Sequence, residues 1–247
     1  MNRNVLKFLY ILVGLFILFI AFVFLALKIN IEVPFLSRFF THRPAFEVTK
    51  HFTFSSEDSL KEWQEKVFKG RVKYKINKQG DECFLDAFSD RAASGLYCKI
   101  KMDVQKRPFI SWKWRMQKLP GKKSSEDLSK KEEDDFAARV YVIFPAPFFT
   151  RTKVIEYIWA NNVPEGTITA SPYTKNIKLF VIKSGESPDE WFTEERDIYQ
   201  DYILVFGERP RMNVGAIAIM TDADSTQTTA HAQYGEIKLG YKKDKEK

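Results

Sequence analysis

The feature that most constrains this chain is an apolar run close to its first residue. From Phe8 to Leu27 no side chain carries a charge. A helix of this length is about 30 Å long, which matches the thickness of the hydrocarbon core of a bilayer. The run is apolar on every face, whereas a surface helix of a soluble protein keeps a polar face. The sequence therefore predicts a transmembrane helix over residues 8–27, after a short stub of residues 1–7.

A cleaved signal peptide is the alternative interpretation of this run. Signal peptides usually have an apolar core of about 7–15 residues and a cleavage site that requires small side chains. The best site here ends at Ala26, and Phe24 occupies a position where a small residue is needed. We therefore favour an uncleaved signal anchor. The basic residues on its two sides are nearly equal in number, but the short N-terminal stub is typical of anchors whose C-terminal part lies outside the cytoplasm.

Charge is concentrated around this segment. The whole chain has a net charge of +7. Residues 1–45 contain five basic side chains and one acidic side chain, whereas basic and acidic residues are nearly equal in number in the rest of the chain. Nucleic-acid binding needs a concentrated basic face, so we expect no nucleic-acid partner. Pro34 and Pro44 interrupt any helix after the membrane, which predicts a linker over residues 28–45.

Residues 46–241 have the pattern of strands. Polar and apolar side chains alternate in residues 71–76, as in a half-buried strand. Residues 138–144 are apolar on nearly both faces and predict a central strand. Further strands are indicated by the runs 110–116, 177–182, 214–220 and 234–241. Many strands with few helices favour a mainly β domain, a two-sheet β-sandwich over residues 46–241, followed by a charged tail of residues 242–247.

Two helices are expected in this domain. Residues 59–67 begin with a capping-box pattern, and residues 199–206 place aromatic and aliphatic side chains on one stripe before Gly207 ends the helix. The charged stretch from Gly121 to Glu133 predicts a solvated loop.

The chain has two cysteines, Cys83 and Cys98. A turn-like sequence between them predicts a hairpin that would place the two residues opposite each other, where a disulfide is geometrically possible. Two free thiols are the alternative, since the bond also requires an oxidising compartment.

One acidic loop suggests a metal. Asp222 and Asp224 follow a predicted strand, and clustered carboxylate oxygens are the ligands that Ca²⁺ prefers. A structural turn, capped by the same side chains, is the interpretation that we favour. The sequence has no zinc-ligand spacing, phosphate-binding loop or dinucleotide fingerprint, so apart from this calcium candidate no cofactor is expected.

Charged residues in or near predicted strands provide the candidate binding residues. Glu194 and Glu195 either occupy the first turn of a helix or pair with Arg139 or Arg196 in a cleft. Arg139 lies in the apolar strand 138–144, and an arginine buried there requires a carboxylate partner. The candidate partners are Glu194, Glu195, Asp201, Asp222 and Asp224.

The tryptophans allow two interpretations. Trp112, Trp114, Trp159 and Trp191 can form a platform for sugar rings, or they can fill the core of the sandwich.

Several motifs in order carry a family resemblance. They are Asp134–Phe144, Tyr157–Ala160, Ser171–Thr174, Trp191 through Glu195 and Arg196, Asp201 with Tyr202, Phe206 with Gly207, Ile219–Thr226, and Tyr234 with Gly235. Over residues 46–241 the chain resembles the bacterial domain of unknown function family three thousand and forty-seven. The resemblance implies an envelope protein with a β-sandwich similar to galactose-binding jelly rolls, and no established activity. It transfers no catalytic residue.

These patterns together give three hypotheses for function. The first is a non-enzymatic binding module for a glycan or glycolipid, with Arg139, Trp159, Glu195 and Arg196 as candidate ligand-binding residues. The second is a polysaccharide hydrolase or lyase that uses a carboxylate–arginine cleft. The third is a scaffold that binds another envelope protein. In each case we expect a single-pass protein of the inner membrane whose C-terminal domain lies in the periplasm.

Overall fold

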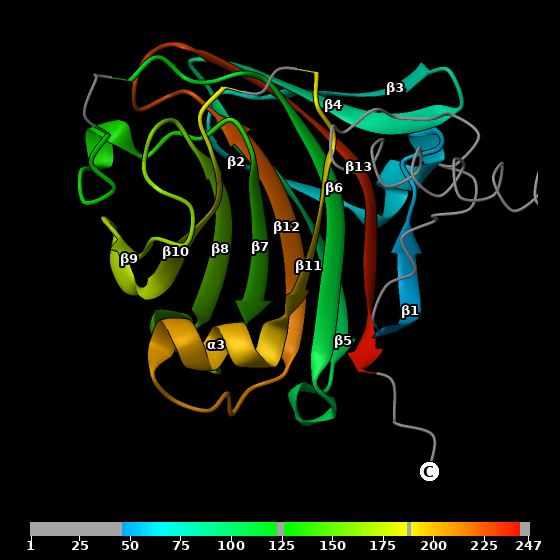
Figure 1. Ribbon diagram of the computed structural model, residues 1–247, viewed down its shortest axis with the longest axis vertical. Helices are drawn as coiled ribbons and strands as arrows, with labels where there is room; N and C mark the ends of the chain where they lie inside the picture. Colours follow the sequence, from blue (N-terminus) through cyan, green and yellow to red (C-terminus); the bar gives the residue numbers. More distant parts are fainter. Residues whose placement is uncertain (1–45, 123–125, 187–188, 243–247) are drawn as a thin grey trace, which may run out of the picture. The chain divides into compact units, whose positions relative to one another are not determined.

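The computed structural model describes residues 46–122, 126–186 and 189–242 (Figure 1). The predicted stub, the predicted transmembrane helix of residues 8–27 and the predicted linker lie outside these residues. Within the described ranges, no helix combines the length and the apolar character needed to cross a bilayer. The described residues form one compact unit.

Two β-sheets make up this unit, which confirms the prediction of a mainly β two-sheet sandwich. Sheet A has the strand order β11-β6-β13-β4-β3, and β1 also pairs with β13. Its strands are β1 (Phe46–Phe52), β3 (Lys73–Gln79), β4 (Glu82–Asp90), β6 (Pro108–Lys118), β11 (Phe192–Asp197) and β13 (Thr229–Lys242).

Sheet B has seven strands in the order β2-β5-β12-β7-β8-β10-β9. The pairing is antiparallel except between β8 and β10. The strand β7, which the sequence predicts to be central, is the fourth of the seven and so is confirmed as a central strand. The strands are β2 (Gln64–Lys69), β5 (Ala93–Met102), β7 (Arg139–Phe144), β8 (Lys153–Ala160), β9 (Ile168–Ser171), β10 (Thr174–Ser184) and β12 (Val214–Asp222).

The main core lies between the sheets, because alternate side chains of each strand point inward. Sheet A contributes Trp112 and Trp114, which are almost completely buried. Sheet B contributes Tyr157, whose ring stacks on Trp112 at 5.0 Å, and Trp159, which packs against Trp114 at 5.6 Å. Three of the four tryptophans therefore fill the core, which is the second of the two interpretations that the sequence allowed.

The helices are short. The helix α3 (Ile198–Phe206) confirms the predicted second helix and ends at Gly207, whose φ of 70° suits a glycine. It lies at the lower end of the strands in Figure 1 and contacts strands of both sheets. The remaining helices of the described residues are 3-10 helices of three to six residues, η1 (Glu57–Glu62), η2 (Val104–Lys106), η3 (Lys131–Glu133) and η4 (Phe149–Arg151).

Two helix predictions need correction. The first predicted helix stops at Glu62, because Trp63 enters the core and the following residues pair with β5 as strand β2. Glu194 and Glu195 do not begin a helix. They lie in strand β11, which pairs with β6, and the N-cap of α3 is Asp197. The strand forms because Phe192 packs on Trp159 in the core.

The predicted hairpin disulfide is also wrong. Cys83 lies in β4 of sheet A and Cys98 in β5 of sheet B, and both thiols are free. The turn between β4 and β5 carries the chain from one sheet to the other, so the two strands never pair. Cys83 lies opposite Lys78, and Cys98 lies opposite Ile217. Burial raises the pKa of the Cys98 thiol.

The segment before β7 is partly buried, although the sequence predicts a solvated loop there. Leu128 and Phe136 cover the outer face of sheet B and form a second hydrophobic core with side chains of β8 and β10. Those partners are Ile158, Ala160, Leu179 and Val181. We call residues 126–136 the covering segment. It shields one end of the outer face of sheet B and leaves the other end open.

Candidate functional site

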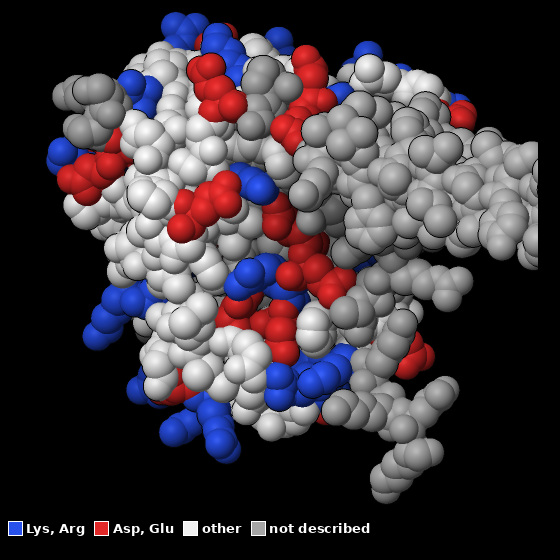
Figure 2. Space-filling model, viewed as in Figure 1, with Lys and Arg blue, Asp and Glu red and all other residues white. Residues whose placement is uncertain are grey.

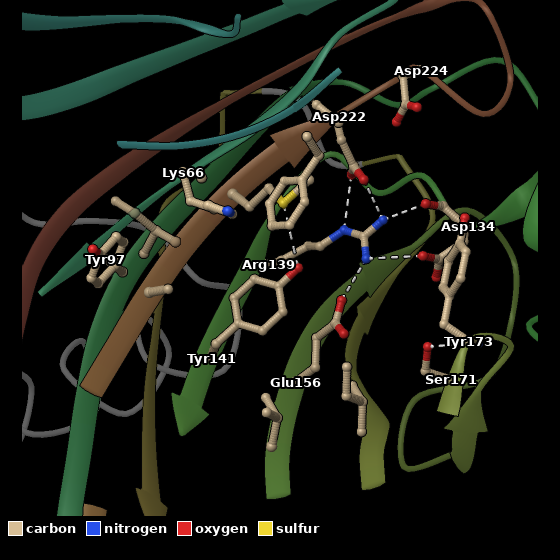
Figure 3. A pocket seen from close by; sticks show the side chains of 18 of the residues that line it. Lys66, Tyr97, Asp134, Arg139, Tyr141, Glu156, Ser171, Tyr173, Asp222 and Asp224 are labelled. Carbon is tan, nitrogen blue, oxygen red and sulfur yellow. Dashed lines mark hydrogen bonds and ion pairs between the residues drawn. The ribbon is translucent and has the colours of Figure 1, made fainter. Parts of the chain in front are cut away.

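A cavity of about 830 Å³ lies on the outer face of sheet B, next to the covering segment (Figure 3). Side chains from β2, β5, β7, β8, β10 and β12 line it, together with Asp134 of the covering segment and Ser171 and Tyr173 near β9. The volume lies within the range of about 300–1,000 Å³ that is typical of small-molecule sites.

The floor of this cavity is apolar where a polar surface is expected. In a sandwich, the face of a sheet that points away from the core is ordinarily solvated and polar. Here Tyr141 and Ile143 of β7 and Ala218 and Met220 of β12 point outward into the cavity, while the alternate residues of both strands enter the core. An apolar outer face indicates a surface that something covers.

Tyrosine side chains frame the middle of the floor. Ala218 lies opposite Tyr97 on one side and opposite Tyr141 on the other, so the small residue is bracketed by two aromatic residues. Tyr173 lines the opposite wall and its side chain is 58% exposed. In Figure 3, Tyr97 and Tyr173 lie on opposite sides of the space around Arg139.

Arg139 lies at the centre of a buried charge network in the wall. Its Nε donates to Asp222 Oδ1 at 2.8 Å, and a terminal nitrogen donates to Asp222 Oδ2. The other terminal nitrogen donates to Glu156 Oε1 at 2.6 Å and lies 3.6 Å from Asp134 Oδ2. The guanidinium also donates to the backbone carbonyl of Asp134. Each of the three side-chain nitrogens of Arg139 therefore donates to a protein acceptor, and Arg139 positions the carboxylates that surround it.

The network contains more negative than positive charge. Arg139 is only 3% exposed and faces three carboxylates, those of Asp134, Glu156 and Asp222. Burial raises the pKa of Asp222 and of Asp134 above their ordinary values. Burial also raises the pKa of Glu156 to about 7, against the opposing effect of Arg139. Glu156 therefore exchanges a proton near neutral pH.

The structure brings only one of the four predicted ligand-binding residues to the cavity. Arg139 lines it. Trp159 points into the core, where its ring nitrogen donates to the carbonyl of Gly185. Glu195 lies in sheet A, opposite Ser111. Arg196 forms two hydrogen bonds with Asp201, at 2.8 and 2.6 Å, and so joins β11 to α3.

Asp222 and Asp224 do lie together, with Asp135 as a third member. One carboxylate oxygen from each lies within 4.8 Å of the others. The oxygens already have partners. Asp222 accepts from Arg139 and from the backbone of Phe136, and Asp135 accepts from the backbone of Ser225 and Thr226. The guanidinium supplies the positive charge that a cation would bring, so calcium at this loop stays a prediction.

Two members of the network were missed by sequence reasoning. Glu156 stands in the run 153–160, which is otherwise largely apolar and forms strand β8. An isolated acid in such a run is the same signal that singled out Arg139. Asp134 belongs to a series of acidic residues that looks like an ordinary charged loop.

The surrounding surface mixes both charges. On the face that Figure 2 shows, Lys and Arg side chains lie beside Asp and Glu side chains, and no continuous area of one sign appears in this view.

We predict that Arg139→Ala strongly destabilises the domain. It leaves three buried carboxylates without their cation, which costs about 3–5 kcal/mol. Arg71→Ala is the matched control, since Arg71 pairs with Glu65 at a side chain that is 71% exposed, and such pairs contribute about 0–1 kcal/mol. Urea unfolding of the fragment 44–247 measures both. Equal stability of Arg139→Ala and the parent would show that the network does not hold the sheet.

We also predict a pH dependence that originates at Glu156. The folded-state pKa of about 7 exceeds the ordinary value of 4.5, so the folded state binds the proton more tightly than the unfolded chain. This contribution to stability is present at low pH and is lost as the pH rises through 7, by about 2–3 kcal/mol between pH 5 and 8. Glu156→Gln removes the titrating carboxyl group. The variant's free energy of unfolding should therefore change less between pH 5 and 8 than that of the parent protein. An unchanged pH profile in the variant contradicts the assignment.

The solved structures that this chain resembles include a carbohydrate-binding module and two glycoside hydrolase domains. The family 11 carbohydrate-binding module of the cellulase Lic26A-Cel5E of Clostridium thermocellum is 10% identical, with 81% of this chain and 100% of that chain covered and a TM-score of 0.42. The xyloglucanase domain of NopAA from Sinorhizobium fredii is 11% identical, with 73% and 93% covered and a TM-score of 0.42. Endoglucanase cel12A from Rhodothermus marinus is 9% identical, with 72% and 91% covered and a TM-score of 0.43.

A likeness of this degree transfers no ligand and no activity to the chain. Comparison with curated proteins gives no match. The family model described as "Protein of unknown function (DUF3047)" matches residues 61–238, which include the described strands from β2 to β12 and most of β13. The chain therefore belongs to the DUF3047 family.

Proposed function

We propose that this domain is a non-enzymatic binding module for a glycan or glycolipid, and that the ligand occupies the cavity on the outer face of sheet B. The observation that carries the proposal is a cavity of about 830 Å³ whose floor is apolar and contains tyrosine side chains. A sugar ring has apolar C–H faces that pack on tyrosine rings such as those of Tyr97 and Tyr141.

The buried network offers the polar part of such a site. Carboxylate oxygens have two lone pairs each, so Glu156 and Asp134 can accept hydrogen bonds from sugar hydroxyls in addition to those from Arg139. A few convergent polar groups in a mostly apolar cavity are typical of ligand sites. Arg139 acts here as a positioning residue, because its own donors are already used within the protein.

A hydrolase or lyase is the second candidate, and one observation favours it. The pKa of Glu156 is about 7, which suits a general acid or base at neutral pH. The carboxylates of Asp134 and Asp222 contact the same guanidinium, that of Arg139. Turnover of the bound glycan, lost in Glu156→Gln, is the result that selects this candidate over a binding module.

We predict that Ala218→Trp strongly weakens glycan binding. Ala218 lies on the cavity floor between two tyrosines, so an indole there fills the space that the ligand needs. A glycan array on the fragment 44–247 first finds a ligand, and calorimetry should then show at least a tenfold weaker affinity for the variant. The control is Lys75→Trp, at an exposed position of β3 in the other sheet.

Melting curves of both variants show whether they fold. Unchanged affinity in a folded Ala218→Trp protein places the glycan outside this cavity and overturns the proposed site. Products released by the parent protein in the same assay would replace the binding module with the enzyme.

We further propose that residues 8–27 anchor the protein in the inner membrane and that the sandwich lies in the periplasm. The uncharged run has the length of a bilayer-spanning helix.

We predict that alkaline phosphatase fused after Lys247 is active in cells, because this enzyme matures only outside the cytoplasm. Activity of a cytoplasmic reporter at the same position, with an inactive phosphatase, would reverse the orientation.

A further inference from the structure

The outer face of strand β8 changes character along its length. Its outward side chains are Val154, Glu156, Ile158 and Ala160. The covering segment buries Ile158 and Ala160 in the second hydrophobic core, and Glu156 binds Arg139. Val154 lines the cavity instead. One end of this apolar face is thus covered by the chain's own residues, and the other end opens to the cavity.

The open end has an aliphatic stripe that crosses three strands. Val154 lies opposite Ile143 of β7 on one side and opposite Ile177 of β10 on the other. All three line the cavity, and none belongs to either hydrophobic core of the described residues. Phe68, 65% exposed, also lines the cavity from strand β2. Val154 is 9% exposed, and Ile143 and Ile177 are partly buried, so a ligand on the stripe would remove its remaining apolar surface from water.

The shape and the chemistry of the cavity indicate what covers the stripe. The cavity volume of about 830 Å³ is typical of small-molecule sites. A stable protein partner would instead bury about 800 Å² of surface on each side, which needs a broad face and not a single cavity. The stripe offers no hydrogen-bonding group, so it suits an alkyl chain better than a sugar. The carboxylates and tyrosines that suit a sugar lie farther along the same strands, at Glu156 and Tyr141.

We infer that the ligand is an amphiphile, a sugar head group joined to a long alkyl chain, whose chain lies along Ile143, Val154 and Ile177. The inference rests on the proposed function and narrows it from glycans in general to glycolipids. The head group then lies against the tyrosines and the Arg139 network.

Alkyl maltosides test this inference directly. The fragment 44–247 is titrated with maltose and with octyl, decyl and dodecyl maltoside, each below its critical micelle concentration. Each added methylene that is buried should tighten binding about fourfold. Dodecylphosphocholine has the same chain without a sugar and should bind more weakly than dodecyl maltoside.

The variants separate the stripe from a general apolar surface. Ile177→Asp places a charge in the stripe, and Ile177→Trp fills the same space without a charge. Both should lose the dependence on chain length. Leu204→Asp is the matched control, because Leu204 is 60% exposed on α3 and does not line the cavity. Melting temperatures identify any variant that fails to fold.

Each outcome decides one claim. Binding that tightens with chain length and weakens in both folded Ile177 variants supports the glycolipid. Affinity that is independent of chain length, with maltose binding retained, overturns the alkyl chain and leaves the glycan module standing. Equal binding of dodecylphosphocholine keeps the alkyl chain and overturns the sugar head group.

Two further results would name a different occupant. Binding to the fragment but not to the full chain would show that a segment of the chain fills the cavity. A fragment that is dimeric by light scattering and binds no alkyl compound would show that a second copy covers the stripe. Either result overturns the inference.

Discussion

The contact of Arg139 with Asp222, Glu156 and Asp134 holds the outer face of sheet B together. It joins three neighbouring strands, β7, β8 and β12, to the covering segment. A guanidinium that is 3% exposed is tolerated because each of its three nitrogens donates to a protein acceptor and carboxylates surround it. Burial, together with the neighbouring carboxylate of Asp134, raises the pKa of Glu156 to about 7.

This network divides the outer face into two regions. On one side, the covering segment buries apolar side chains of β8 and β10 beneath Leu128 and Phe136. On the other side, the aliphatic and tyrosine side chains of the same sheet open into the cavity. The inner face shows no such division, since tryptophans and aliphatic residues of both sheets fill the space between them. A ligand in the cavity would thus complete a surface that the chain covers only in part.

The sequence predicted the fold class well because strands leave a strong periodic signal. The alternation in 110–116 and the apolar run 138–144 correspond to β6 and β7. Pairing between distant strands leaves no such signal. The Cys83–Cys98 hairpin failed for this reason, since its two strands belong to different sheets.

The candidate site was predicted only in part. Arg139 was recognised as a charge that needs a buried partner, and Asp222 was among the candidate partners, because a lone charge in an apolar strand is rare. The choice among the acids depended on which strands lie beside β7, which the sequence does not reveal. Trp159, Glu195 and Arg196 carry chemistry suited to ligands, yet they lie away from the cavity. Trp159 points inward from sheet B, whereas Glu195 and Arg196 belong to sheet A, and the sequence reveals neither placement.

The central claim is that the outer face of sheet B is the ligand site. Backbone amide chemical shifts of the isotope-labelled fragment 44–247, followed during addition of dodecyl maltoside, test it most directly. The account predicts shifts concentrated in β5, β7, β8 and β12 around the cavity, with β3 and β4 of sheet A unchanged. Shifts confined to sheet A, or no shifts at saturating ligand, would contradict it.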